Sequence, residues 1–203
     1  APVMHQIGEK WACGEAAVYQ ERRACEICMR LLHELRSTTA SIEAAAPTAI
    51  GGTIENDIYT IPATMAEVVL RSVGWVATEI GTNLPFDTMR KAISETRPRL
   101  FWLSVSFISD EEAFVEGIND LFLAAHEFGS ALAIGGQAVS ESLRQQIQYT
   151  TFCESFRDLE MFARSLHSHR SQPTPASAGK LALNQIPQSE LEQSAEPDAN
   201  AAE

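Results

Sequence analysis

The sequence is poor in basic residues and has no long apolar run, and each shortage excludes a class of protein. Its 203 residues include 15 Lys and Arg against 27 Asp and Glu, which gives a net charge of −12. A surface of that sign repels phosphates, so the chain is not expected to bind DNA or RNA unaided. No apolar run reaches the ~20 residues of a membrane helix and no signal-peptide pattern is visible, so we expect a cytoplasmic protein with no membrane partner.

Cysteine is also scarce, and the four cysteines do not form a disulfide framework: Cys13, Cys25, Cys28 and Cys153. The segment Cys25–Cys28 has the spacing of a zinc or redox motif, but it falls in a predicted helix and no second Cys or His pair follows at metal-site spacing. We interpret both cysteines as small core residues. No nucleophile, phosphate-binding or His–Glu metal motif is present, so we predict no metal and no enzyme.

Helical periodicity dominates the first part of the chain. From Trp11 to Arg36 there is no proline, and apolar residues recur at helical spacing, namely Ala24, Ile27, Cys28, Leu31 and Leu35. The small, polar segment 37–48 contains Pro47 and is typical of a connector. We therefore predict a helical bundle cap over residues 1–47.

The pattern then changes to short β-rich runs that alternate with helical stretches. Strands are predicted at 49–55, 75–80, 100–106, 131–134 and 151–153, and helices at 63–73, 86–95, 110–128, 141–146 and 155–167. This alternation predicts an α/β fold over 48–168, a flavodoxin-like, doubly wound, five-stranded parallel sheet preceded by the small helical bundle. Residues 169–203 are rich in Ser, Gln, Pro, Ala and Glu, which predicts a disordered acidic tail.

Glycine and small hydroxyl residues cluster where the predicted strands end. The clusters are Gly51-Gly52, Gly81-Thr82, Ser104-Val105-Ser106 and Gly135-Gly136. Ligands of doubly wound sheets bind at the carboxyl ends of the strands, where a close backbone approach and hydrogen-bond donors are needed. The sequence therefore predicts one crevice lined by these clusters.

Two parts of the chain, one in the α/β region and one in the helical region, resemble known proteins. GTIENDIYTIPATMAEVVLRSVGWVATEIGTNLP, LFWLSVS and AIGG, which fall within residues 49–140, resemble the cobalamin-binding domain family. The segment WACGEAAVYQERRA, through Trp11, Gly14, Val18 and Glu21, resembles the helical bundle of light-responsive, MerR-type repressors that use adenosylcobalamin. This resemblance implies that Trp11 covers the face of the cofactor while Glu21 and Arg22 shape a polar rim, and that Ser104 and Ser106 bind a nucleotide tail inserted beside the sheet.

The chain departs from the family at both axial positions of the cobalt. Family members with a lower imidazole carry Asp-x-His-x-x-Gly, whereas this register reads Asp57, Tyr59 and Pro62. A phenol must lose a proton to become a good ligand, so coordination by Tyr59 is not expected. In the repressors a histidine follows the glutamate and binds the upper face; here Arg22 stands there and cannot ligate. Cobalamin is therefore expected to bind without protein coordination, if it binds at all.

These features are compatible with three functions. The first is a non-enzymatic, photoreceptor-like sensor of a transcription regulator, a homo-oligomer that binds cobalamin or another tetrapyrrole and reaches DNA only through a further N-terminal domain. The second is a corrinoid carrier in methyl transfer. The third is a degenerate domain that binds no cofactor and serves in dimerisation or protein binding, which we would infer if Tyr59 and Phe107 filled the crevice.

Overall fold

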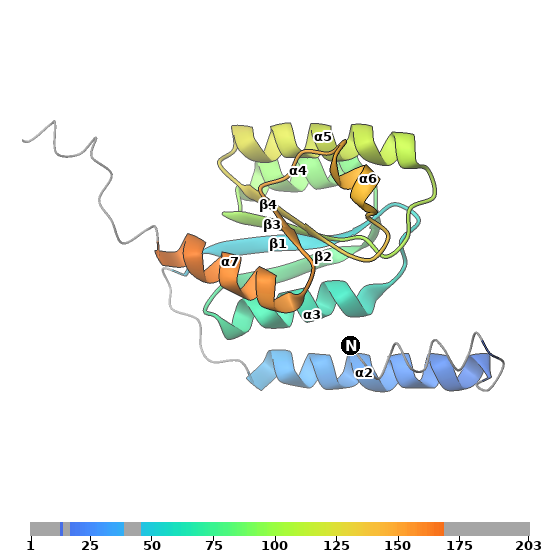
Figure 1. Ribbon diagram of the computed structural model, residues 1–203. Coiled ribbons are helices and arrows are strands. Elements are labelled where there is room, and N and C mark those ends of the chain that lie inside the picture. The colour runs from blue at the N-terminus through green and yellow to red at the C-terminus, as the bar shows by residue number, and fades with distance from the viewer. Residues whose placement is uncertain (1–12, 14–16, 39–45, 169–203) are drawn as a thin grey trace, which may run out of the picture. The chain divides into compact units, whose positions relative to one another are not determined.

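The computed structural model describes residue 13 and residues 17–38 and 46–168 (Figure 1). Helices and strands alternate along the chain, in the order α2 Val18–Thr38, β1 Thr48–Ile54, α3 Thr60–Ser72, β2 Val76–Leu84, α4 Phe86–Thr96, β3 Leu100–Ser104, α5 Glu111–Glu127, β4 Ala131–Gly135, α6 Glu141–Arg144, β5 Thr151–Cys153 and α7 Phe156–Ser168. The predicted α/β class is confirmed. Trp11 and the predicted tail 169–203 lie outside the described residues.

All five strands are parallel and lie in the order β2-β1-β3-β4-β5. Helices α4, α5 and α6 pack on one face and α3 and α7 on the other (Figure 1). The chain changes winding direction between β1 and β3, which are neighbours in the sheet. This is the flavodoxin-like arrangement that the sequence predicts, and its switch point is where such sheets bind ligands.

Each face of the sheet has its own core. The α4/α5 core contains large residues, including Ile50, Phe101, Leu103, Phe114 and Ile118. The α3/α7 core contains mostly small residues with two indoles, including Ala49, Ala77, Ala133, Trp75 and Trp102. Because both faces are covered, all five residues of β3 are buried and the first four, Leu100 to Leu103, are apolar.

Two elements, α3 and β2, extend at least three residues beyond their predicted bounds. Helix α3 begins at Thr60 rather than Ala63 because Pro62 falls in its first turn, where the missing N–H needs no partner. Strand β2 continues to Leu84 rather than Ile80. The Asn83 N–H donates to the Thr53 hydroxyl at 3.0 Å and to the Asp57 carbonyl at 3.1 Å, so the end of β2 is held against β1.

Helix α5 agrees closely with the prediction for residues 110–128. The Asp110 carboxylate is the N-cap and accepts from the Ala113 N–H at 3.0 Å. Gly129 follows the C-cap with a φ of +71°, a left-handed conformation in which glycine is favoured. No helix in the described part of the chain has the length and apolar character to cross a membrane.

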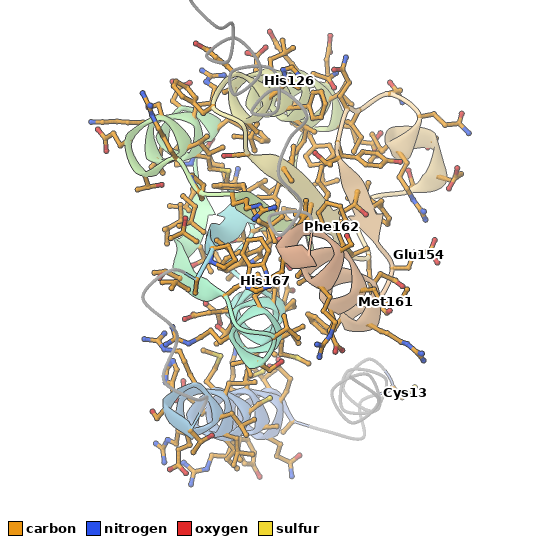
Figure 2. The ribbon with its side chains drawn as sticks, turned by 90° about the vertical axis from the view of Figure 1, so that its left-hand side faces the viewer. Cys13, His126, Glu154, Met161, Phe162 and His167 are labelled. Carbon is orange, nitrogen blue, oxygen red and sulfur yellow. The ribbon has the colours of Figure 1, made fainter. Side chains whose placement is uncertain are left out.

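Helix α2 packs on α3, as Figure 2 shows. Leu32 is the only buried residue of its 21. A guanidinium nitrogen of Arg36 lies 3.3 Å from a carboxylate oxygen of Glu67, which is buried on α3. The contact between the two helices is thus narrow and partly ionic.

Candidate functional site

The carboxyl ends of β1 and β3 carry a buried carboxylate that joins two loops. Asp57 is fully buried, and its Oδ1 accepts from the Tyr59 N–H at 3.1 Å. Its Oδ2 accepts from the N–H groups of Ser106 and Phe107 at 2.6 Å and 3.3 Å. Three backbone donors therefore hold one carboxylate between the β1–α3 loop and the β3–α5 loop.

The backbone of Asp57 is tied down as well. Its N–H donates to the Ile54 carbonyl at 3.0 Å, and its carbonyl accepts from the Thr53 hydroxyl at 2.5 Å. A charged acceptor with several amide donors forms strong hydrogen bonds. The Asp57 side chain consequently acts as a fixed clamp, and it is not available to orient a metal ligand.

Three large apolar side chains stand exposed around this clamp. Ile58, Tyr59 and Phe107 are 63%, 57% and 46% exposed, and we call them the edge platform. Tyr59 is the N-cap of α3 but makes no side-chain capping bond. A degenerate domain would have been favoured if Tyr59 and Phe107 were buried within a crevice. Neither side chain is buried.

The row of residues at the strand ends on the α3/α7 face consists of Thr53, Ser104 and Gly135, which are partners in register. Ser104 is only 7% exposed, and its hydroxyl makes no hydrogen bond to another described residue. The Thr53 hydroxyl is already engaged. Of the two serines predicted to bind a nucleotide tail, neither hydroxyl bonds to another described residue, and Ser106 in addition donates its backbone N–H to Asp57.

The next row inward is filled by an indole. Trp102 is 2% exposed and lies over Gly51, where an added Cβ would be 2.2 Å from Trp102 Cδ2. The Trp102 Nε1 is buried with no hydrogen-bond partner among the described residues. A nucleotide tail inserted beside the sheet would have to displace this ring. In the sequence, LFWLS is recognisable only as an apolar strand, so this role of the indole was not predicted.

Gly135 and Gly136 lie at the carboxyl end of β4, as predicted, and chain packing explains them. The prediction that Gly51-Gly52 ends the first strand is wrong, because β1 continues to Ile54. Gly136 has a φ of +130°, and a Cβ there would lie 2.0 Å from the Val105 carbonyl oxygen. At Gly135 an added Cβ would lie 2.9 Å from the Cys153 carbonyl oxygen. Gly81 and the half-buried Thr82 lie in the irregular end of β2. Their contact with a ligand stays a prediction.

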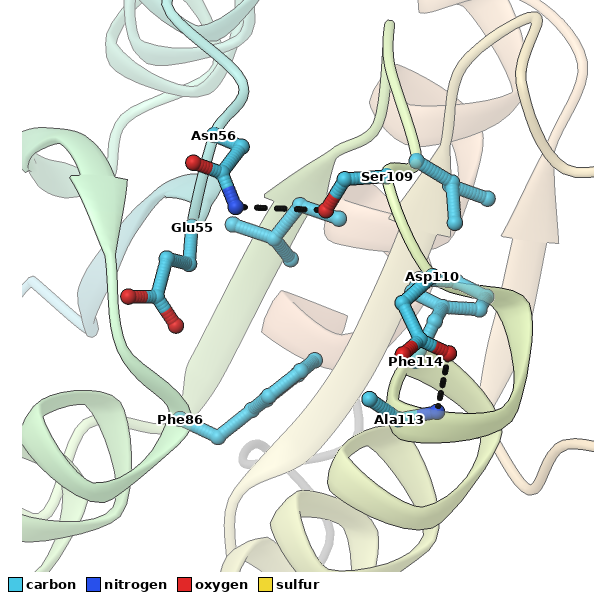
Figure 3. A pocket seen from close by; sticks show the side chains of 9 residues that line it. Glu55, Asn56, Phe86, Ser109, Asp110, Ala113 and Phe114 are labelled. Carbon is cyan, nitrogen blue, oxygen red and sulfur yellow. Dashed lines mark hydrogen bonds between the residues drawn. The ribbon is translucent and has the colours of Figure 1, made fainter.

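A small pocket opens beside the clamp on the α4/α5 side (Figure 3). Its volume is about 90 Å³, and Phe86 lies across it while the Asn56 amide donates to the Ser109 hydroxyl at 3.2 Å. It is lined by Ile54, Glu55, Asn56, Phe86, Ile108, Ser109, Asp110, Ala113 and Phe114. Sites for drug-sized ligands measure ~300 Å³ or more, so a tetrapyrrole cannot enter. No predicted site residue lines it.

The charged residues predicted on the helical cap interact within α2. Arg22 Nε lies 3.6 Å from Glu21 Oε2, and the Cys25 thiol donates to Glu21 Oε1 at 3.3 Å. Burial, followed by the nearby Glu21 carboxylate, raises the pKa of Cys25, which disfavours the thiolate needed for metal binding or redox chemistry. The polar contacts of Glu21 and Arg22 with described residues do not reach the carboxyl edge.

An acidic pair formed by the buried Glu67 of α3 and the half-buried Glu79 of β2 was not predicted from the sequence. Glu67 is fully buried, and its Oε1 lies 3.3 Å from Arg71 while its Oε2 accepts from the Glu79 N–H at 3.4 Å. The Glu79 carboxylate accepts from the Thr64 hydroxyl at 2.7 Å. Burial raises the pKa of Glu79 and Glu67 adds to the effect, while Thr64 opposes it. These contacts join three separate elements, α3, β2 and α2, so no local motif indicates them.

The described residues contain no group of three or more His, Cys, Asp or Glu side chains that could hold a metal ion. Cys153 lies beside Gly135 at the strand ends, and burial raises its pKa to about 11. At neutral pH this thiol is protonated and a poor nucleophile. The described edge therefore offers apolar surface and hydroxyl groups.

Comparison with known proteins gives a likeness in structure alone. No protein-family model matches the chain, and no curated protein matches it significantly. Among solved structures, the monomethylamine corrinoid protein of Methanosarcina barkeri aligns with a TM-score of 0.65 at 16% identity over 80% of this chain and 78% of that one. The chain has the fold of corrinoid proteins.

Two further structures support the same fold. A cobalamin-binding protein from Desulfitobacterium hafniense aligns with a TM-score of 0.53 at 20% identity, over 80% of this chain and 77% of that one. The methanol:cobalamin methyltransferase complex of Methanosarcina barkeri aligns with a TM-score of 0.54 at 16% identity, over 88% and 67%. The resemblance of the cap to light-responsive repressors stays a prediction.

Proposed function

We propose that the chain is a corrinoid-binding module without catalytic activity of its own, which holds a cobalamin-type ring on the edge platform and gives the cobalt no ligand there. The observation that carries the proposal is the Asp57 clamp, which fixes the exposed Ile58, Tyr59 and Phe107 at the switch point of a corrinoid-protein fold. Exposed apolar side chains on a rigid edge suit a flat, largely apolar ring.

The residues at the edge fit the apolar face of such a ring, but they provide no histidine to coordinate its cobalt. The described histidines, His33, His126 and His167, lie on α2, α5 and α7. At the edge, the residue in the ligand register is Tyr59, and the carboxylate that would orient an imidazole is already bonded to three amides. A bound corrinoid would supply cobalt chemistry, and this chain would contribute stacking surface and the Ser104 hydroxyl.

We further propose a sensory role, with DNA bound through another domain. Helix α3 links the two regions involved, because Tyr59 caps its start while Glu67 on its third turn pairs with Arg36 of α2. A ligand shifts a conformational equilibrium only by binding two arrangements differently. A ring on the platform that changes the start of α3 would therefore change how firmly α2 is held.

A corrinoid carrier in methyl transfer is the second candidate. It is favoured by the likeness to a corrinoid protein and to a methanol:cobalamin methyltransferase complex. The two roles differ in the events after the corrinoid has bound. A carrier is methylated and demethylated repeatedly by a partner enzyme, whereas a sensor changes the hydrogen exchange of α2 amides when the corrinoid binds.

Equilibrium dialysis in the dark with hydroxocobalamin and adenosylcobalamin, followed by absorption spectra, tests the proposal. We expect retained corrinoid with a base-off spectrum, and an affinity at least about tenfold lower in Phe107→Glu because a charge replaces apolar contact. Leu123→Glu, a 60% exposed apolar residue on α5, is the matched control and should bind normally. No retention by the wild type would favour a degenerate domain, and equal loss in both variants would show that the corrinoid does not bind on the edge platform.

The buried indole predicts a preference that sharpens this test. With Trp102 packed over Gly51, the nucleotide tail has no room beside the sheet, so cobalamin and tail-less cobinamide should bind with similar affinity. Trp102→Ala should then favour cobalamin, because the truncation opens space below Ser104. A strong preference of the wild type for cobalamin would show that the ring moves aside on binding.

A further inference from the structure

Helix α2 presents an apolar surface that the described fold does not cover. Ile27, Leu31 and Leu35 are 48%, 58% and 52% exposed, and we call them the α2 stripe. Residues four apart on a helix differ by about 40° in direction, so the three form one continuous strip. Leu32, which faces α3, points about 100° away from its centre. The stripe is thus a second apolar face of the same helix.

The charges beside the stripe indicate what covers it. Arg23 and Glu34 are both exposed and lie on the flank away from Leu32, about 80° and about 60° from Leu31. They carry opposite charges and stand near opposite ends of the stripe. We propose that two copies of this chain associate in antiparallel fashion through the α2 stripe, with Arg23 of each copy beside Glu34 of the other.

The geometry of two antiparallel helices supports this pairing. In the antiparallel register that places Ile27 opposite Leu31, the symmetry centre is at residue 29, and Arg23 comes within about one residue, or 1.5 Å of rise, of the level of Glu34, while Leu35 lies level with Arg23 of the other copy. Antiparallel packing brings the same flank of both helices together, so the pair forms twice. Parallel packing would set Arg23 against the Leu32 side and form neither pair.

Local charge also favours self-association at this helix. Val18–Thr38 contains four arginines and three glutamates, whereas the whole chain carries −12. Repulsion between two acidic chains is therefore weakest here. Arg30 lies on the same flank near the symmetry centre, but Glu26 and Glu34 stand one turn away on its own helix and offset its charge.

The expected complex is weak. A strip of three side chains with two flanking ion pairs is smaller than the ~1,200 Å² of a standard interface, so we expect a dissociation constant of about 10–100 µM. Sedimentation velocity of the full chain at low salt and without corrinoid, from about 1 to about 200 µM, should show the mass rising from 22.2 kDa toward twice that value.

Charge reversal tests the orientation. Arg23→Glu and Glu34→Arg should each raise the dissociation constant about tenfold, because each turns two attractions into two repulsions. The double variant R23E/E34R restores opposite charges and should return to within about threefold of the wild type. Arg157→Glu, an exposed reversal on α7, is the control and should leave the dissociation constant unchanged.

A wild type that stays monomeric at every concentration would overturn the proposal, and Leu31→Glu would then identify the true occupant. A lower melting temperature of that variant would mean that the chain's own residues cover the stripe, and an unchanged one would leave the stripe to another protein. A dimer whose dissociation constant is the same in Arg23→Glu, Glu34→Arg and the double variant would overturn the antiparallel arrangement. Because no corrinoid is present, none of these results bears on the proposed cofactor.

Discussion

The two faces of the sheet are packed by different means. On the α4/α5 face, register partners such as Ile50, Phe101 and Leu132 are all large and interlock with helix side chains. On the α3/α7 face, the partners of Trp102 are Gly51 and Ala133. One face fills its space with many large groups, and the other fills it with one indole between small neighbours.

The difference suggests that the α4/α5 face mainly stabilises the fold and that the α3/α7 face is the one a ligand could enter. An interlocked face cannot admit a ligand without unfolding, because close-packed side chains have no room to move. A face whose filling depends on a single ring can open if that ring turns. The row of Thr53, Ser104 and Gly135 beyond Trp102 keeps the same small profile out to the carboxyl edge. The α3/α7 face is therefore the one on which the proposed ligand would compete with packing.

Phe101→Ala should have the largest effect on stability. The ring is fully buried in the α4/α5 core, and its loss leaves a cavity that the neighbours cannot fill, so the free energy of unfolding should fall by about 3–5 kcal/mol. Urea denaturation followed by circular dichroism measures this change. A loss below about 1 kcal/mol would show that this face repacks freely and would remove the contrast.

Gly51→Ala should destabilise the other face by about 1–3 kcal/mol, since the new methyl group would lie 2.2 Å from both the ring and the carbonyl oxygen of Trp102. The informative measurement is a double-mutant cycle by urea denaturation with Trp102→Leu, which removes most of the ring. The methyl group should cost clearly less in the Trp102→Leu background. Equal costs in both backgrounds would mean that the backbone near the Trp102 carbonyl, not the indole, sets the limit.

Asp57→Asn should cost about 1–2 kcal/mol, because the amide keeps one acceptor oxygen and loses its charge-assisted bonds. Backbone hydrogen exchange should rise at Tyr59, Ser106 and Phe107, which donate to this carboxylate. Asp110→Asn, which alters only a helix cap, is a control for the loss of one carboxylate nearby. Unchanged exchange at all three amides would contradict the clamp.

Glu79→Gln should produce the smallest change, and it should depend on pH. Burial raises the pKa of Glu79 above its ordinary value of 4.5, so the folded state holds its proton more tightly than the unfolded state. That contribution is complete below the ordinary value and is lost as pH rises through the folded-state pKa. The variant should flatten the fall in stability over this range in urea titrations. A free energy of unfolding of the wild type that rises with pH over this range would contradict a raised pKa of Glu79.

Sequence reasoning recovered the fold because both of its signals are local. Apolar runs such as Leu100–Ser104 and punctuation such as Gly129 predict strands and helix ends one at a time, and alternation then implies the parallel sheet. Ser104-Val105-Ser106 and Gly135-Gly136 lie at the strand ends where they were predicted, whereas Gly51-Gly52 lies inside β1. The role of Asp57 was not predictable, because its partners Ser106 and Phe107 are about fifty residues away in the chain.

The contacts that were not predicted from the sequence are of the same kind. Trp102 lies over Gly51, and Glu67 bonds to Arg36, a residue 31 positions away. Neither pair is implied by spacing, since each depends on which strands and helices become neighbours. The exposure of Ile27, Leu31 and Leu35 could not be predicted from the sequence for a related reason. Apolar periodicity identifies a face that can be buried, but it does not say whether anything buries it.

The two buried indoles also give the protein built-in optical reporters. Trp75 precedes β2 at the amino end of the sheet, whereas Trp102 lies one row from the carboxyl edge, and both belong to the α3/α7 core. A coloured ring bound at that edge would quench emission from Trp102 more than from Trp75, because energy transfer falls steeply with separation. Comparing Trp75→Phe with Trp102→Phe by emission spectroscopy would thus locate a bound chromophore without crystallising the complex.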